Sequence, residues 1–179
     1  MSSTQYVDVE SYLRRLDDGN LHPTNVDAIR SFIDHCAAEG ISEVRQERLA
    51  SALKSILVNL APNAFQLTNA SEQEIKRVVA VLNRSDYAQS TKHTFRSALK
   101  KFYKVENGGH KEPGKTKFFA VGKPGSTVSR EDIFTKDELK GLLRSFSSTR
   151  DRALTLMLYE SAARPGEMLS RNIGDFTAN

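Results

Sequence analysis

The sequence predicts a mainly α-helical protein, and two kinds of observation lead to this fold class. Apolar residues recur at the spacing of a helix with one buried face, in one segment after another. Most of these segments follow residues that typically begin a helix and run into a glycine or proline that ends it. The pattern predicts a compact bundle of four or five helices over residues 5–106, an aperiodic linker over 107–132 and further helices over 133–179.

The first strong helix is expected between the sequence His22-Pro23-Thr24 and Gly40. Thr24 is the expected N-cap, with Asp27 in an acidic first turn. The buried stripe of this helix should consist of Val26, Ile29, Phe32, Ile33 and Cys36.

Three more helices are expected before the linker. One should begin after Ser42 and end before Pro62, because proline cannot continue a helix. The next should begin at Ser71, which with Glu74 has the spacing of a capping box. The last should begin at Ser90, and its expected buried stripe consists of Phe95, Leu99 and Phe102.

Residues 107–132 hold several glycines and prolines and no clear period, which is typical of an interdomain linker. Residues 118–121 form a short apolar patch that we expect to dock against one domain. The basic residues of the linker suit it to lie along a polyanion; they include Lys111, Lys115, Lys117 and Lys123.

Beyond the linker, Thr135 and Glu138 form a second expected capping box. Another helix should start at Arg150-Asp151, and Pro165 fits the first turn of a further short helix. This segment therefore continues the helical pattern.

The composition is that of a soluble globular protein, with 39% apolar and 27% charged residues. No run of residues is long and apolar enough to span a membrane, and the N-terminal residues do not form a secretory signal. We therefore expect a cytoplasmic protein without a membrane partner. Cys36 is the only cysteine, so no disulfide forms within the chain, and its spacing predicts a buried thiol.

Several familiar chemistries are not indicated. The phosphate-binding motif G-x-x-x-x-G-K-[ST], the zinc motif H-E-x-x-H and the nucleophile motif G-x-S-x-G do not occur. The four histidines are scattered and, with one cysteine, predict no metal site. We expect no metal, no cofactor and no small-molecule ligand.

Charge is distributed unevenly along the chain, although the net charge is only +4. Residues 76–130 hold 13 lysines and arginines but only 3 acidic residues. Residues 1–75 hold 6 lysines and arginines and 11 acidic residues. Such asymmetry favours an anionic partner, and nucleic acid is the first candidate. A solvated face that keeps the protein soluble is the alternative.

The fourth expected helix concentrates this charge. Lys92, Arg96 and Lys100 recur at every fourth position on one face, with Lys101 and Lys104 beside them. Like charges at this spacing destabilise an isolated helix, and a bound anion would relieve the repulsion. We therefore expect this face to contact DNA phosphates, with an exposed solubilising face as the alternative.

Near the end of the sequence, an apolar helical run leads into the motif YESAARPGEML over residues 159–169. Arg164 in this motif has two interpretations. It either caps the carbonyl groups of the preceding helix, or it is held by Glu167 with its guanidinium aimed at a phosphate. Spacing does not choose between them.

The segment over residues 134–176 resembles the start of the catalytic domain of tyrosine recombinases, the phage-integrase and Xer class. Residues 40–57 and 81–104 resemble the SAM-like core-binding domain of these proteins, in the style of archaeal integrases, and the whole resemblance covers residues 25–177. The catalytic-domain motifs are matched in register by Thr135, Glu138, Leu139, Arg150, Asp151, Ala153, Leu154, Arg164, Glu167, Leu169 and Asp175.

The resemblance implies a role for each part of the chain. Arg164 would be the first catalytic arginine, contacting the scissile phosphate, and Glu167 would orient it. Residues 5–106 would clamp double-stranded DNA, with other recombinase protomers as further partners. The expected DNA-contacting residues are Arg45, Lys92, Arg96, Lys100, Lys101, Lys104, Lys115 and Lys117.

The chain also departs from the family. Ala162 replaces the usual glycine before the arginine, Arg171 replaces a leucine, and no tyrosine follows Tyr159. Covalent strand cleavage needs a nucleophile and its partners, and the family's tyrosine and second arginine are not in this sequence. We therefore expect a truncated recombinase that binds DNA without completing catalysis.

Two alternatives stay open: a short form that modulates a full-length recombinase, and a helical module whose basic face binds an acidic protein. In each case we expect residues 133–179 to be less stable than the bundle, because their apolar faces would lack partners.

Overall fold

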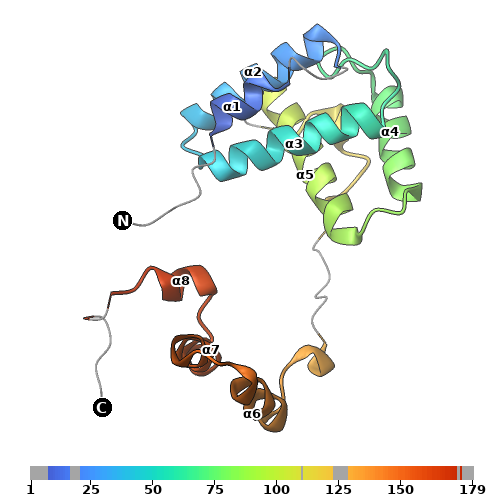
Figure 1. Cartoon of the computed structure of the whole chain (residues 1–179). Coiled ribbons are helices and arrows are strands. Elements are labelled where there is room, and N and C mark those ends of the chain that lie inside the picture. The colour runs from blue at the N-terminus through green and yellow to red at the C-terminus, as the bar shows by residue number, and fades with distance from the viewer. Residues whose placement is uncertain (1–7, 17–20, 110, 123–128, 173, 175–179) are drawn as a thin grey trace. The chain divides into compact units, whose positions relative to one another are not determined.

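Helices make up all the regular secondary structure that the computed structural model describes, which covers residues 8–16, 21–109, 111–122, 129–172 and 174 (Figure 1). No strand occurs in these ranges, so the predicted mainly α-helical class is confirmed. The chain divides into an N-terminal unit within residues 5–125 and a C-terminal unit within residues 126–179.

The N-terminal unit is a bundle of α1 (Val9–Arg14), α2 (Pro23–Ala38), α3 (Glu43–Asn59), α4 (Glu72–Arg84) and α5 (Gln89–Glu106). Helix α3 contacts α1, α2 and α5, while α4 packs against α5 (Figure 1). Each helix turns its apolar stripe to a common core, where the largest fully buried side chains include Ile29, Ile33, Leu53, Ile56, Leu67, Ile75, Leu82, Leu99, Phe102 and Tyr103. The buried position of Cys36 agrees with its spacing.

The helix starts follow local chemistry, with two corrections to the expected caps. His22, not Thr24, is the N-cap of α2: its Nδ1 atom accepts from the Thr24 backbone N–H, and Pro23 occupies the first helical position. Helix α5 begins at Gln89 after Ala88, one residue before the expected Ser90. The predicted capping box of α4 is confirmed, since the Ser71 backbone N–H donates to Glu74 at 2.8 Å.

A buried asparagine ties α2 to the connection between α3 and α4. The Asn25 amide donates to the Phe65 carbonyl at 2.8 Å and accepts from the Leu67 N–H at 2.9 Å. Asn25 is 3% exposed, so these bonds satisfy polar backbone groups that have no access to solvent. The connection is thereby fixed to the bundle.

Residues 111–121, called the strap below, lie within the predicted linker but pack against the bundle. Their short 3₁₀ turn, η1 (Gly114–Thr116), contacts α4, and Thr116 and Phe119 are buried. Lys76 of α4 lies over the Phe118 ring, and Lys100 of α5 lies over the Phe119 ring. The first half of the predicted linker is therefore part of the N-terminal unit, whereas Lys123 lies outside the described residues.

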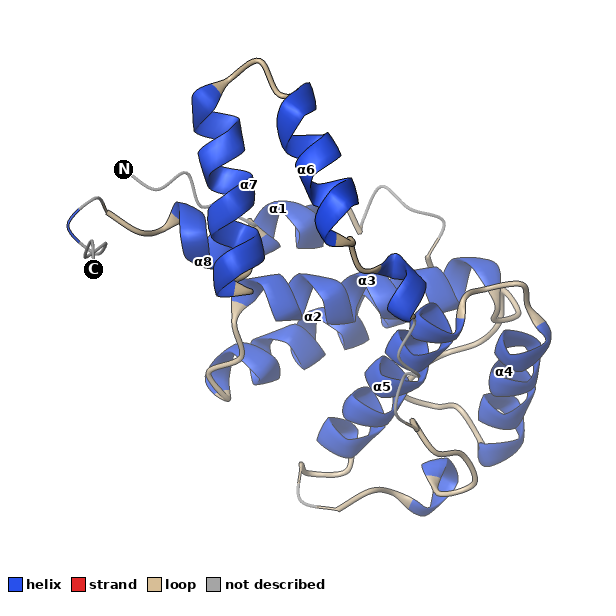
Figure 2. Cartoon of the chain, turned by 90° about the horizontal axis from the view of Figure 1, so that it is seen from below, coloured by secondary structure: helices blue, strands red, loops and turns tan. Residues whose placement is uncertain are grey.

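The C-terminal unit contains η2 (Arg130–Asp132), α6 (Lys136–Ser145), α7 (Thr149–Ser161) and α8 (Pro165–Leu169). Helices α6 and α7 run side by side as a hairpin (Figure 2). The predicted capping box at the start of α6 is confirmed by the bonds between Thr135 and Glu138. Among the described residues of this unit, Leu139 alone is buried.

Candidate nucleic-acid interface

Two of the expected DNA-contacting residues on α5, Lys92 and Arg96, bind the end of α4. Lys92 is only 7% exposed, and its ammonium donates to the Asn83 carbonyl at 3.0 Å. Arg96 donates to the Asn83 side-chain oxygen at 2.5 Å. Both cations thus lie at the C-terminal end of α4, where positive charge interacts favourably with the helix dipole. Lys92 therefore does not belong to an exposed face, contrary to the expectation from its spacing.

The solvent-facing side of α5 carries the other three lysines. Lys100 pairs with Glu112 of the strap at 2.5 Å, and Lys101 pairs with Glu39, the C-cap residue that follows α2. The hydrogen bond from Lys100 lowers the pKa of Glu112, and the bond from Lys101 lowers the pKa of Glu39. Lys104 is exposed and has no side-chain partner among the described residues.

A groove lined by both polar and apolar side chains runs between α3 and α5. Arg45 and Arg48 of α3 line it on one side, and His93 and Ser97 of α5 line it on the other. A second hollow along α3 shares Arg48 and Thr94 with this one, and the two are together called the groove; Glu47 is the one acidic residue in their lining. The remaining side chains that line the groove are Ser42, Val44, Leu49, Ser51, Ala52, Ser55, Thr94 and Phe95.

The two arginines of this groove are available to a ligand. Both are exposed, and their guanidinium groups form no hydrogen bond or ion pair within the parts of the chain that the structure describes. Guanidinium groups bind phosphate oxygens strongly, and hydroxyl groups are among the neutral side-chain donors that also contact them. The groove, Arg45, Arg48 and Lys104 together form what we call the α3–α5 face.

Sequence reasoning identified Arg45 and Lys104 but missed Arg48, His93 and Ser97 of this groove. A signal was present, because Arg45 and Arg48 are three positions apart on one helix and so project from the same side. The contribution of His93 and Ser97 depends on how α5 packs beside α3, which no spacing within α5 encodes.

The strap lysines differ from each other in availability. Lys115 lies over the Tyr103 ring, with its ammonium 4.5 Å from the ring centroid, and it also reaches the Ala70 carbonyl at 3.5 Å. Lys117 is exposed. Of the two strap lysines expected to contact DNA, Lys117 is therefore the more accessible.

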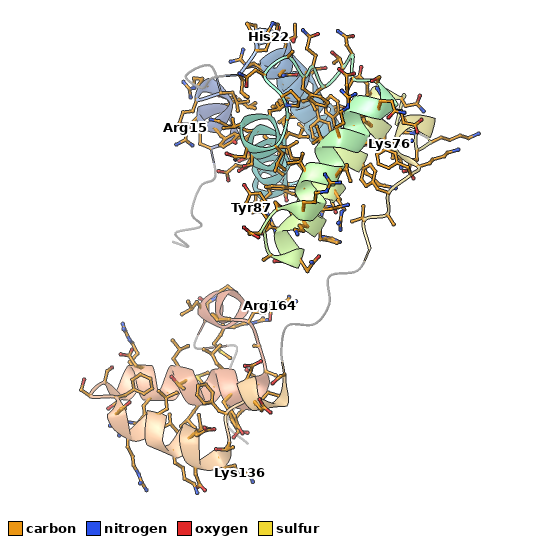
Figure 3. All side chains as sticks on the ribbon, turned by 90° about the vertical axis from the view of Figure 1, so that its right-hand side faces the viewer. Arg15, His22, Lys76, Tyr87, Lys136 and Arg164 are labelled. Atoms are coloured by element: carbon orange, nitrogen blue, oxygen red, sulfur yellow. The ribbon has the colours of Figure 1, made fainter. Side chains whose placement is uncertain are left out.

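Arg164 lies in the C-terminal unit, where Figure 3 labels it. Helix α7 ends at Ser161, Ala162 takes a left-handed conformation with φ of +50°, and Arg164 becomes the N-cap of α8. Its backbone N–H donates to Glu167 at 2.9 Å, and its guanidinium donates to the other carboxylate oxygen at 3.1 Å.

This geometry distinguishes the two interpretations of Arg164. No hydrogen bond from its guanidinium to the carbonyl groups of α7 occurs; the side chain is held instead by Glu167. Because 86% of the side chain is exposed, the guanidinium donors that do not face Glu167 are open to an anion. Asp175, the last residue of the matched motif, lies outside the described residues.

The described residues contain no group of three or more side chains suited to a metal ion. None of their helices has the length and apolar character needed to cross a membrane. Comparison with models of protein families, with curated proteins and with solved structures finds no match to the chain.

Proposed function

We propose that this chain binds double-stranded DNA through the α3–α5 face of its helical bundle. The observation that carries the proposal is the pair of exposed arginines, Arg45 and Arg48, beside the hydroxyl groups of a groove. Duplex DNA presents closely spaced phosphates, and each one that a cation neutralises releases condensed counterions, which favours binding. Lys104 and Lys117 extend the set of exposed cations.

We further propose that the chain belongs to the tyrosine recombinase family. In this assignment residues 5–106 are the SAM-like core-binding domain, and residues 133–179 are the start of the catalytic domain. The pairing of Arg164 with Glu167 supports it, because a carboxylate that holds one side of a guanidinium leaves the other side oriented toward a phosphate. The spacing of the motifs is the second support.

In this assignment Arg164 would supply phosphate binding, but no residue within 1–179 corresponds to the family's nucleophile for strand cleavage. The last tyrosine, Tyr159, lies in α7 and therefore precedes Arg164, whereas the family's nucleophile follows the arginine. We therefore propose that the chain by itself binds DNA without forming a covalent intermediate.

The test is a comparison of two double variants with equal charge changes. Arg45→Ala with Arg48→Ala removes the groove arginines, and Arg77→Ala with Arg84→Ala removes two exposed arginines of α4. Binding of a fluorescent mixed-sequence duplex is measured by anisotropy over a range of salt concentrations. The groove variant should bind the duplex about tenfold more weakly or worse. The slope of its log K against log salt should become shallower by about 0.9 for each phosphate that the protein no longer neutralises.

Equal weakening of both variants would mean that net charge, not the α3–α5 face, governs binding. Absence of duplex binding by the unmodified chain at low salt would overturn the proposed function and favour an acidic protein as the partner.

A further inference from the structure

Two carboxylates flank the lysines on the solvent-facing side of α5, and each comes from a different element. Glu39 at the end of α2 pairs with Lys101, and Glu112 of the strap pairs with Lys100. The partners lie 62 and 12 positions apart in the sequence, so the tertiary fold brings both pairs together. The lysines that the basic helix would present to a phosphate already have anionic partners.

The fold keeps both carboxylates in place. Glu112 also accepts from the Thr116 hydroxyl at 3.3 Å, and Thr116, itself part of the strap, is fully buried. The strap is anchored further by Phe119, whose ring centroid lies 5.1 Å from the Lys100 ammonium. Glu39 is fixed by the end of α2 and lies 3.4 Å from the Nε2 atom of His35.

We propose that Glu39 and Glu112 are intramolecular competitors for the phosphates that Lys100 and Lys101 would otherwise bind. The inference rests on the proposed function, because it assumes that DNA reaches this side of α5. Each carboxylate takes the place of a phosphate oxygen, so a ligand must displace it before it can bind the lysine.

The competition has a consequence for the kind of anion that binds. Ion pairs between partly exposed side chains are weak, and all four side chains here are between 21% and 39% exposed. A duplex held by the unpaired arginines places further phosphates near the lysines at high local concentration and can displace the carboxylates. A single small anion binds too few groups at once to do so. The carboxylates thus favour dense phosphate arrays over isolated anions.

The experiment uses Glu39→Gln, Glu112→Gln and their combination in the full chain. The matched control is Glu72→Gln, which removes the same charge from an ion pair of the same kind, at 2.5 Å from Lys76 on α4. Affinity for the mixed-sequence duplex is measured by anisotropy, and folding is checked by thermal melting. Each test substitution should tighten duplex binding by about two- to fivefold more than the control does. This factor corresponds to the free energy of one exposed ion pair. The salt dependence should also steepen, by about 0.9 in slope for each lysine freed.

A double-mutant cycle shows whether Glu39 acts through its lysine. In a Lys101→Ala background, Glu39→Gln should change affinity no more than the control does.

If Glu39→Gln and Glu112→Gln tighten duplex binding only as much as Glu72→Gln does, the inference is overturned, while the proposed DNA binding stands. Weaker binding in the test variants would also overturn it, because the carboxylates would then be positioning the lysines for DNA. If no variant binds the duplex at all, the proposed function fails, and the inference fails with it.

Discussion

At the scale of single residues, Ala162 shows how one backbone angle shapes the Arg164 turn. It has a φ of +50° and is the one non-glycine residue with positive φ in the described parts of the chain. A left-handed conformation brings the Cβ atom close to the following carbonyl oxygen, which costs about 1–2 kcal/mol for residues other than glycine. The turn that delivers Arg164 to the start of α8 is therefore strained at Ala162.

We predict that Ala162→Gly stabilises the C-terminal unit. The relief of strain outweighs the greater flexibility of glycine in the unfolded chain, so the net gain should be about 0.5–1 kcal/mol. Native-state hydrogen exchange of the amides of α7 and α8 measures it. Ala163→Gly is the control, because the φ of Ala163 is not positive. This substitution only makes the unfolded chain more flexible, so it should destabilise the C-terminal unit. Equal effects of the two substitutions would contradict the explanation.

At the scale of elements, contacts between different helices and connections decide how these parts meet. The Asn25 amide fixes the connection between α3 and α4 against α2, and Lys92 and Arg96 fix the end of α4 against α5. The strap docks through Thr116 and Phe119. None of these contacts follows from the periodicity of the helix that carries it.

Asn25→Ala should destabilise the N-terminal unit by about 2 kcal/mol. The substitution leaves the Phe65 carbonyl and the Leu67 N–H without their partner in a buried setting. Urea denaturation followed by circular dichroism gives the free energy of unfolding. Asn63→Ala is a suitable control, because Asn63 is exposed and should contribute less than about 0.5 kcal/mol. A loss for Asn25→Ala as small as that of the control would show that solvent replaces both bonds.

At the scale of the whole molecule, the two units differ in how much apolar surface they bury. The N-terminal unit encloses a continuous core drawn from all five of its helices and their connections, including Leu16, Ile29, Leu53, Ile75 and Leu99. In the C-terminal unit Leu139 alone is buried among the described residues, while Ile133, Phe134, Leu156, Tyr159 and Leu169 are exposed. Burial of apolar area is the main stabilising term in folding, so the two units should differ in stability.

We therefore predict that hydrogen exchange is much slower over residues 25–106 than over residues 133–172. The amides of α3 and α5 should require global opening of the bundle, whereas those of α6 and α7 should exchange by local unfolding. Mass spectrometry of peptides from the full chain reports both regions in one experiment. Comparable protection in the two regions would contradict this prediction and would indicate that a partner or a second copy covers the apolar residues of the C-terminal unit.

The sequence by itself determined the helical class, the apolar stripes and the capping boxes at Ser71 and Thr135. These features are local: they depend on residues three or four positions apart, which a helix always brings together. The pairing of Arg164 with Glu167 also spans three positions, but the spacing left a cap on the α7 carbonyl groups equally open, and only the structure distinguished the two. The tyrosine recombinase assignment also comes from the sequence and stays a proposal.

Only the tertiary structure decided which cations are free. Lys92 and Lys100 have the spacing of an exposed basic stripe. The structure shows, however, that Lys92 binds the end of α4 and that Lys100 pairs with Glu112 of the strap. Their partners lie on other elements, so no pattern within α5 reveals them. The groove between Arg48 and His93 likewise exists only because α3 and α5 pack together. A helix dictates where its charges point, but the elements packed around it determine whether those charges remain available.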